Sequence, residues 1–256
     1  MVKNQIMIEM EYSLRYVKSV LSKSKISEYT INPYVGCENN CKYCYARFMK
    51  RVLGIKEPWG SFVYVKINAP EILKGEITRK KRGEVWISGV CDPYQPAEAE
   101  YQITRKCLGV LLTKDWPIQI QTKCPLVLRD VDLLKQFTQA DVGFSIATAD
   151  EQVKLLFESK TPSVASRIAA LEKLHVAGIR TFVMIAPILP GAEKLMDLLV
   201  GKVDYVLVDK MNYNHARWVY KKYGLEYALA DEFFADMGRT IEEQCQKLGI
   251  PCRILF

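Results

Sequence analysis

From Glu84 onward the chain alternates between short apolar runs and longer amphipathic segments. The apolar runs are rich in β-branched residues and predict strands over 85–90, 118–122, 142–147, 179–185 and 205–208, with a last one over 253–256. The segments between them have helical spacing and predict helices over 101–113, 126–137, 163–177, 192–199 and 230–248. Gly178 and Gly249 directly follow two of these helices, as is typical of a helix end.

Before Glu84 the pattern is less regular. Apolar residues at helical spacing predict an N-terminal helix over 8–21, with its apolar positions at Met10, Leu14, Val17 and Leu21. The elements expected next are a strand over 28–34, a helix from about 44 to 54, a strand over 62–65 and a short helix after Pro70.

Strand–helix alternation with apolar strands predicts a parallel sheet with helices on its faces. About six βα units can be counted, fewer than the eight of a closed barrel. The α/β fold we expect is therefore a partial, open (βα)6 TIM-like barrel over 28–210. A short N-terminal helix in an extension over 1–27 would precede it, and a C-terminal helical extension over 211–256 would pack on it.

Length and composition narrow the class of protein. The 256 residues, 49% of them apolar, suffice for a sizeable core. No run of about 18 apolar residues occurs, so a membrane span is not expected. Because the first ten residues are too charged for a signal peptide, we expect a cytoplasmic protein whose eight cysteines serve metal or redox chemistry rather than disulfides.

The net charge of +7 is concentrated in the first third of the chain. Residues 1–82 hold 16 Lys and Arg against 7 Asp and Glu, and they include the basic run 74–82. A basic field attracts nucleic acid, nucleotides or acidic peptides, although a run of charge is most often a solvated surface.

Three cysteines form a CxxxCxxC run at Cys37, Cys41 and Cys44, with Tyr43 before the last of them. Three thiolates on one loop can hold three corners of a cubane iron–sulfur cluster and leave the fourth iron open. A zinc knuckle is an alternative, but zinc takes four ligands and no histidine or cysteine nearby in the sequence supplies the fourth. An electron carrier would also use four cysteines.

Polar and unusual residues lie at the ends of six of the expected strands, where parallel α/β folds place their sites. The cysteine loop follows the first strand, and the next strands are followed by 91–96, 123–125, Thr148, 186–191 and 209–212, while Ser145 lies within the fourth strand. The sequence therefore predicts one site, ringed by strand ends around the cysteine loop.

The cysteine run resembles the signature of the radical S-adenosylmethionine (radical SAM) superfamily. Further segments are similar to its spore photoproduct lyase-related (SPL-like) branch, namely 32–37, 44–47, 92–96, 122–123, 125–130 and 158–162, with Arg167 and Ala186–Pro187. The resemblance spans about 29–210 and implies a barrel of the radical SAM type. It also implies a 4Fe-4S cluster on the three cysteines and S-adenosyl-L-methionine (SAM) as second cofactor. The reduced cluster would cleave SAM to a 5′-deoxyadenosyl radical that abstracts hydrogen.

The resemblance also implies the residues that contact SAM. The candidates are Tyr43, Ser88, Asp92, Lys123, Ser145, Arg167 and Pro187. The loop from Ser88 to Asp92 would meet the methionyl amine, and Lys123 the methionyl carboxylate, which pairs with a cation. Ser145 would contact the ribose or carboxylate, although it could equally be an ordinary strand hydroxyl. Arg167 would be a second carboxylate partner or only a helix-surface ion pair.

Three residues are candidates for hydrogen transfer, namely Cys91, Tyr94 and Cys124. Spore photoproduct lyases carry a hydrogen-donating cysteine on the loop after the second strand, where this chain has Cys91; the alternative is a small buried residue under SAM. With Cys124 in the same cavity, a thiol donor or a reversible disulfide becomes possible. Tyr94 could relay a hydrogen atom or simply pack with its hydroxyl bonded. The same two roles are open to Tyr213, and His215 is a candidate for substrate contact.

The expected function is that of a lyase-like radical SAM enzyme with an unknown substrate. A nucleic-acid lesion of the thymine type is one version, motivated by the basic first third of the chain. A peptide, tRNA or small metabolite is the alternative, and an iron–sulfur electron carrier or redox sensor is an alternative of another class. The expected partners are SAM, the substrate and an electron donor such as flavodoxin or ferredoxin, with no membrane.

Overall fold

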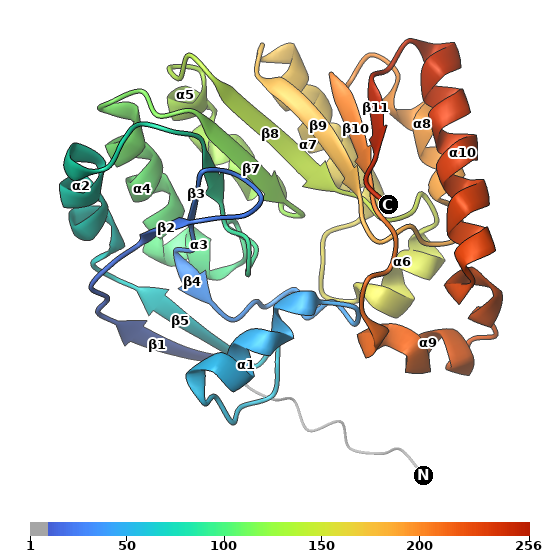
Figure 1. The fold of residues 1–256 in the computed structure, drawn as a ribbon, viewed down its shortest axis with the longest axis horizontal. Coiled ribbons are helices and arrows are strands. Elements are labelled where there is room, and N and C mark those ends of the chain that lie inside the picture. The colour runs from blue at the N-terminus through green and yellow to red at the C-terminus, as the bar shows by residue number, and fades with distance from the viewer. Residues whose placement is uncertain (1–9) are drawn as a thin grey trace.

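The structure, a computed structural model, describes residues 10–256. Its main sheet has eight strands in the order β11-β10-β9-β8-β7-β6-β3-β2 (Figure 1). Every neighbouring pair is parallel except β2 with β3. The strands are β2 (Leu21–Lys23), β3 (Tyr29–Ile31), β6 (Val85–Ile87), β7 (Ile118–Thr122), β8 (Ala140–Ser145), β9 (Arg180–Ile185), β10 (Tyr205–Val208) and β11 (Cys252–Ile254).

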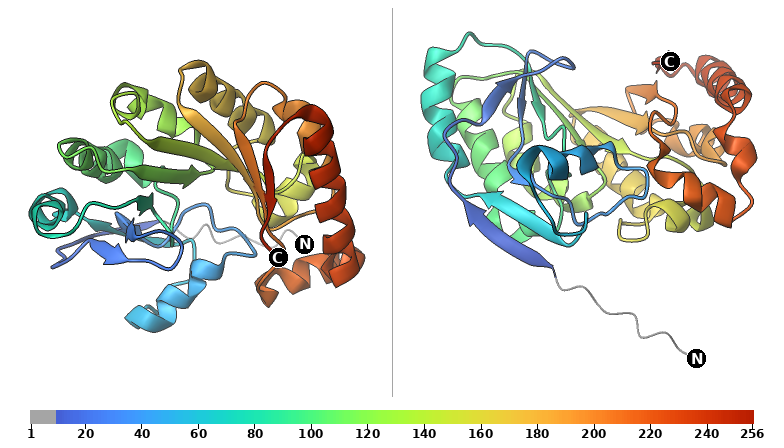
Figure 2. Two further views of the ribbon diagram at one scale, coloured as in Figure 1. Left: turned by 45° about the horizontal axis from the view of Figure 1, so that its top comes forward. Right: turned by 60° about the horizontal axis from the view of Figure 1, so that its bottom comes forward.

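Helices connect the strands and lie on the outer side of the curved sheet (Figure 2). The connections up to β10 contain α2 (Ala69–Arg79), α3 (Ala97–Tyr101), α4 (Ile103–Leu112), η2 (Pro125–Asp130), α5 (Val131–Leu134), α6 (Glu151–Phe157), α7 (Val164–Val176), η3 (Ala192–Lys194) and α8 (Leu195–Leu199). The last connection contains η4 (Asn214–Ala216), α9 (Arg217–Lys222), η5 (Glu226–Leu229) and α10 (Asp231–Leu248). Because β2 and β11 are the two ends of the strand order, the sheet is open, as expected of a partial TIM-like barrel.

The barrel strands alternate between core and interior. Along β7, Ile118 and Ile120 are buried in the main hydrophobic core, whereas Gln119 and Gln121 are half-buried. Side chains of a strand alternate between its two faces, and only the outer face is covered by helices here. The inner face can therefore carry polar side chains. The sequence analysis did not predict this, because it treated the strands as apolar throughout.

A second sheet has three strands in the order β1-β5-β4. Strand β1 (Glu11–Arg15) pairs in parallel with β5 (Phe62–Lys66), which pairs antiparallel with β4 (Tyr34–Val35). The predicted N-terminal helix over 8–21 is therefore wrong where the structure describes it; residues 8 and 9 lie outside the described part. Its apolar spacing also fits an extended segment, and the backbone pairs that β5 offers exist only in the folded chain.

Most other expected elements are confirmed. β7 and β10 coincide with the strands predicted over 118–122 and 205–208, and α10 begins one residue after the helix predicted over 230–248. The helix predicted near 44–54 is a 3₁₀ turn, η1 (Tyr45–Arg47), that continues into α1 (Phe48–Leu53). Helix α6 was not predicted. The boundaries at 27 and 210 stay predictions.

The C-terminal segment is joined to the barrel. Strand β11 pairs with β10, and Phe234, Ile241 and Cys245 of α10 belong to the main core. Across residues 10–256, no helix has the length and apolar character needed to cross a membrane.

Candidate active site

A cavity of about 880 Å³ lies at the carboxyl ends of the parallel strands. It is lined by the cysteine loop and by residues at or after the ends of the next five strands, namely 88–92, 121–123, Ser145, 186–187 and 209–213. The predicted gathering of strand-end residues around the cysteine loop is therefore confirmed. A volume in this range suits a drug-sized ligand.

Cys37, Cys41 and Cys44 all line this cavity. The turn between them is fixed by backbone hydrogen bonds, since the amide of Asn40 donates to the carbonyl of Cys37 and the amide of Cys44 to that of Cys41. Arg47 Nη2 donates to the Cys41 carbonyl at 3.1 Å. The loop therefore presents its three thiols from a fixed backbone.

The entry to the cysteine loop depends on Gly36. This residue has a φ of +90°, and a Cβ there would lie 2.3 Å from the carbonyl oxygen of Phe62 on β5. Any side chain would therefore push the loop off the second sheet. Gln95 holds the same stretch from the other side, with its Oε1 accepting from the Glu38 amide and its Nε2 donating to the Gly36 carbonyl.

The thiols of Cys37 and Cys41 are buried and that of Cys44 is half-buried, and all three are neutral without a metal. Burial raises the pKa of Cys41 to about 12, against the opposing charge of Lys123, and it also raises the pKa values of Cys37 and Cys44. Metal binding must therefore displace their protons. No three His, Cys, Asp or Glu side chains within residues 10–256 converge as ligands of one metal ion. A cluster requires less convergence, because its thiolates bind separate iron atoms, so the three thiols fit a cluster better than a zinc ion.

Trp59 adds a hydrogen-bond donor beside this loop. Its indole N–H is buried and has no hydrogen-bond partner among the described residues. The cysteine loop is close by: burial raises the pKa of the Cys44 thiol, and the Trp59 N–H is one of the groups that lower it, so this donor is available to a cluster held by Cys44. An N–H facing a cluster sulfur stabilises the more negative, reduced state.

The change Trp59→Phe is expected to make the reduction potential of the bound cluster more negative. The phenyl ring keeps the edge-to-face contact with Phe62, whose ring centroid lies 6.0 Å away, but it removes the N–H. An EPR-monitored redox titration measures the shift, with iron content as a check on loading. Trp218→Phe is the matched control because Trp218 is exposed on α9. Equal potentials in the two variants would rule out an effect of the Trp59 N–H on the cluster.

A buried charge network closes one wall of the site. The Glu158 carboxylate lies 2.7 Å from Arg167 Nη2 and 3.7 Å from Lys123 Nζ, and it accepts a hydrogen bond from the Tyr43 hydroxyl. Burial alone would raise the pKa of Glu158, but the charges of Arg167 and Lys123 outweigh it and hold this pKa at about 2. Burial lowers the pKa of Lys123, yet Glu158 and Cys41 raise it overall, so this lysine is charged beside the cavity.

The Asp92 carboxylate accepts four hydrogen bonds and thereby organises the site. Its carboxylate accepts from Thr122 Oγ1 at 2.5 Å, from the Lys123 amide at 2.8 Å and from Asn39 Nδ2 at 2.9 Å, and also from the Tyr94 amide. It thus joins the cysteine loop to the ends of β6 and β7. Asp92 was expected from the sequence to contact SAM, but in the structure its carboxylate oxygens accept hydrogen bonds from protein groups.

Ser88 and Ser145 both line the cavity. Ser88 has a φ of +72°, and its hydroxyl bonds the Cys91 carbonyl at 2.9 Å and lies 2.7 Å from the Cys91 sulfur. Ser145 accepts a hydrogen bond from Gln121 Nε2 at 2.7 Å. Tyr43, Lys123, Cys91 and Pro187 also line the cavity.

Three sequence candidates lie elsewhere. Tyr94 is fully buried and its hydroxyl bonds Asp130 at 3.0 Å, outside the cavity lining. Cys124 is half-buried and does not line the cavity either. Arg167 is buried behind the wall, where its guanidinium contacts Glu158 and the carbonyls of Ser145 and Pro162. These placements argue against direct contact of the three with a ligand.

An aromatic rim joins Tyr213 and His215, which were sequence candidates, to Tyr45, which the sequence analysis missed. Tyr45, after the last cluster cysteine, stacks on Tyr213 with ring centroids 6.0 Å apart, and Tyr213 stacks on His215 at 5.9 Å. Tyr45 and Tyr213 line the cavity. Tyr45 follows β3 and Tyr213 follows β10, and these positions at strand ends were the only sequence signal for the rim. The contact between them exists only in the folded chain.

A family model described as the radical SAM superfamily matches residues 31–195. The chain belongs to this superfamily. Members of the radical SAM superfamily bind a 4Fe-4S cluster and SAM, and the cavity beside Cys37, Cys41 and Cys44 fits both.

Relatives of known sequence agree with this membership. An uncharacterized protein of Methanocaldococcus jannaschii is 39% identical over 175 residues, which cover 68% of this chain and 66% of its own. An uncharacterized protein of Mycobacterium tuberculosis is 33% identical over 186 residues, which cover 68% of this chain and 54% of its own. The match to this chain thus spans between about half and two thirds of these relatives.

Solved structures share the fold. Spore photoproduct lyase complexed with dinucleoside spore photoproduct has a TM-score of 0.72 at 18% identity, covering 96% of this chain and 82% of that one. SuiB of Streptococcus suis bound to precursor peptide SuiA has a TM-score of 0.56 at 14% identity, covering 97% of this chain and 49% of that one. The expected partial barrel of the radical SAM type is confirmed.

Proposed function

We propose that this chain is an enzyme that binds a 4Fe-4S cluster through Cys37, Cys41 and Cys44 and holds SAM in the adjoining cavity, in order to abstract hydrogen from a substrate. The observation that supports this most is that three loop thiols and the buried cation Lys123 share one cavity at the strand ends. When bound, the reduced cluster supplies the electron that cleaves SAM, and the cleavage supplies the radical.

The chain's own residues orient SAM and keep water out. Lys123 pairs with the methionyl carboxylate, because its ammonium is charged and it lines the cavity. The hydroxyl of Ser145, fixed by Gln121, meets the ribose. Pro187 offers an apolar surface for the adenine. Tyr43 and Arg167 act indirectly, because both hold Glu158, which in turn positions Lys123.

Replacing Lys123 with methionine is expected to weaken SAM binding about ten- to hundredfold, the range for loss of one charged hydrogen bond. KM for SAM should rise more than kcat falls, because the lysine binds a part of SAM remote from the breaking bond. Equilibrium dialysis with the loaded protein measures the affinity. Lys247→Met, at the exposed end of α10, is the control. Unchanged affinity in Lys123→Met would exclude the carboxylate contact.

Cys91 is the hydrogen donor in the lyase-like version of this proposal. Its thiol lines the cavity and is held by Ser88 and the Tyr34 carbonyl. Burial raises its pKa to about 12, against the lowering effect of Ser88, so it carries S–H at neutral pH. Cys91→Ala should therefore stop product formation while SAM cleavage continues, whereas Cys124→Ala keeps both. Full turnover in Cys91→Ala would refute the role.

A nucleobase is the substrate group that we favour. The stacked rings of Tyr45, Tyr213 and His215 form a platform at the cavity, and aromatic rings of this kind bind bases by stacking. Spore photoproduct lyase, which shares the fold, is solved in complex with dinucleoside spore photoproduct. SuiB shares the fold too and is solved with a peptide, so a peptide, tRNA or metabolite is the alternative.

The test begins with anaerobic protein reconstituted with iron and sulfide. After addition of dithionite and SAM, 5′-deoxyadenosine is measured by mass spectrometry, with omission of dithionite as control. Ultraviolet-irradiated oligonucleotides with deuterated thymidine then report hydrogen abstraction, because deuterium would appear in the 5′-deoxyadenosine. Label from deuterated peptide pools but not from the oligonucleotides would favour the alternative. If the protein carries a loaded cluster but neither binds nor cleaves SAM, the remaining interpretation is an electron carrier or redox sensor.

A further inference from the structure

Helix α1 presents an unusual number of apolar side chains to solvent. Phe48, Val52 and Leu53 are 44%, 62% and 48% exposed, and no residue of α1 is buried in the described part of the chain. Only Met49 packs inward, on the cluster of apolar side chains beneath the cysteine loop. A contiguous apolar patch of this kind on a surface marks an interaction site more often than scattered single residues do.

Basic residues accompany these apolar side chains along the chain. Between Asn39 and Lys56 the sequence has no Asp or Glu, but it has five basic residues, at Lys42, Arg47, Lys50, Arg51 and Lys56. Neither Lys50 nor Arg51 forms an ion pair within residues 10–256. The patch therefore combines an apolar centre with a positive rim, which fits an acidic partner.

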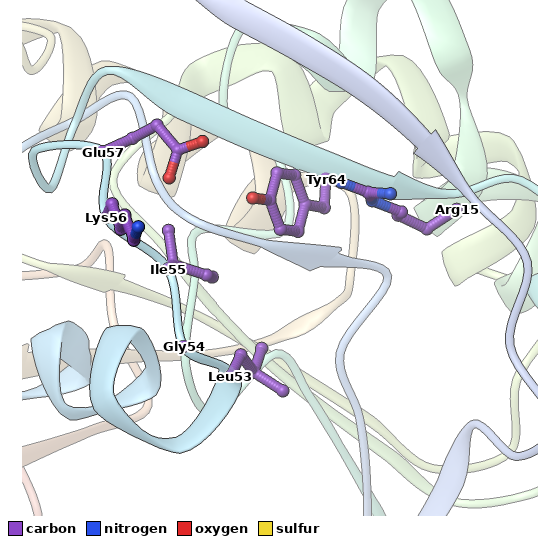
Figure 3. Close-up of a pocket in the computed structure, with 7 residues that line it drawn as sticks. All are labelled: Arg15, Leu53, Gly54, Ile55, Lys56, Glu57 and Tyr64. Atoms are coloured by element: carbon purple, nitrogen blue, oxygen red, sulfur yellow. The ribbon is translucent and has the colours of Figure 1, made fainter.

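A hollow of about 440 Å³ continues the patch toward the second sheet. Figure 3 shows Leu53, Ile55 and Lys56 facing Tyr64 and Arg15 across it. The Arg15 guanidinium lies 4.5 Å from the centre of the Tyr64 ring, which adds another exposed cation to the rim. Glu57 is the one acidic residue among those that line the hollow.

The patch lies next to the cluster cysteines. Cys44 is the N-cap of η1, which continues directly into α1. Since helical residues advance about 1.5–2 Å each, Lys50 and Arg51 are within roughly 15 Å of Cys44. In Figure 1, α1 lies at the bottom of the view, apart from the helices that cover the main sheet.

We propose that α1 and its basic rim are the docking surface for an acidic one-electron donor protein of the flavodoxin type. This rests on the proposed function, because only a redox-active cluster needs such a donor. One electron leaves the reduced donor, which is oxidised by one electron, and enters the cluster, which is reduced by one; no bond forms or breaks. The surface thus brings an acidic donor to the side of the chain where the cluster cysteines lie.

The experiment uses the full chain with its cluster reconstituted and a reduced bacterial flavodoxin as probe. Stopped-flow absorbance gives the second-order rate of cluster reduction at low and high salt. The double variant Lys50→Glu with Arg51→Glu should lower this rate at least tenfold and weaken its salt dependence. Reduction by dithionite, which needs no docking, should be unchanged. The matched control is Lys173→Glu with Lys247→Glu, two exposed lysines that precede β9 and β11 at the opposite ends of the strands.

Other outcomes assign the patch differently. Equal rates for the α1 variant and the control would overturn the proposal while SAM cleavage with dithionite keeps the proposed function intact. Failure of SAM cleavage with dithionite would instead reject the proposed function itself. If the protein sediments as a dimer and the Val52→Asp variant as a monomer, α1 is the contact with a second copy of the chain. Anionic vesicles that displace flavodoxin would assign it to a lipid surface, and either result overturns docking of a donor.

Discussion

Replacing Cys41 with alanine is expected to abolish cluster binding and 5′-deoxyadenosine formation, whereas Cys107→Ala preserves both. Cys41 lines the cavity, and its loss leaves two of the three thiolates that hold the cluster. Cys107 is equally buried, but it lies on α4 in the main hydrophobic core. The pair therefore separates loss of a ligand from loss of a buried thiol.

Iron and sulfide content per chain, visible absorbance and 5′-deoxyadenosine by mass spectrometry measure the effect. Circular dichroism shows whether each variant is folded. If Cys41→Ala kept full iron, sulfide and SAM cleavage, the cysteine loop would not be the cluster site. If both variants lost the cluster, the effect would be one of folding, and a Cys41→Ser variant of similar volume would decide between the two explanations.

The parts of the site that lie on one short segment could be predicted from the sequence. Cys37, Cys41 and Cys44 were identified by their spacing. Lys123 was identified by its place after an apolar run together with the resemblance to the radical SAM superfamily. In both cases the local backbone decides where the side chain goes. The barrel followed for the same reason, since strands such as Ile118–Thr122 are fixed by composition and flanking turns.

Residues that depend on distant partners could not be placed in this way. Tyr94 and Asp92 are two positions apart on one loop, yet only Asp92 borders the cavity, because Asp130 holds the Tyr94 hydroxyl on the other side. One expectation for Arg167 was an ion pair on the exposed surface of its helix. The structure instead buries Arg167, where it pairs with Glu158. The N-terminal helix failed likewise, because β5 pairs with Glu11–Arg15 from 51 positions along the chain.

Glu158 shows what such long-range contacts do for stability and for the site. Its side chain and that of Arg167 are each 1% exposed, so their ion pair is shielded from solvent. Glu158→Gln removes the negative charge and leaves the buried guanidinium uncompensated. Breaking a buried pair from one side costs about 3–5 kcal/mol of unfolding free energy. Asp236→Asn, which breaks an exposed pair with Arg239, should cost no more than about 1 kcal/mol.

The pH dependence of this loss tests its electrostatic origin. The folded pKa of Glu158 is about 2, below its ordinary value of 4.5, so its stabilisation is fully present above about pH 4.5 and is lost as the pH falls toward 2. The depression corresponds to about 3 kcal/mol. The difference in unfolding free energy between wild type and Glu158→Gln, from urea titrations, should therefore be constant from neutral pH to about 4.5 and shrink below it. A difference that stays constant down to about pH 3 would mean that packing, and not the charge, is what Glu158 contributes. Loss of stability with the predicted pH dependence would instead establish that the charge of Glu158 holds Arg167 and Lys123 in place beside the cysteine loop.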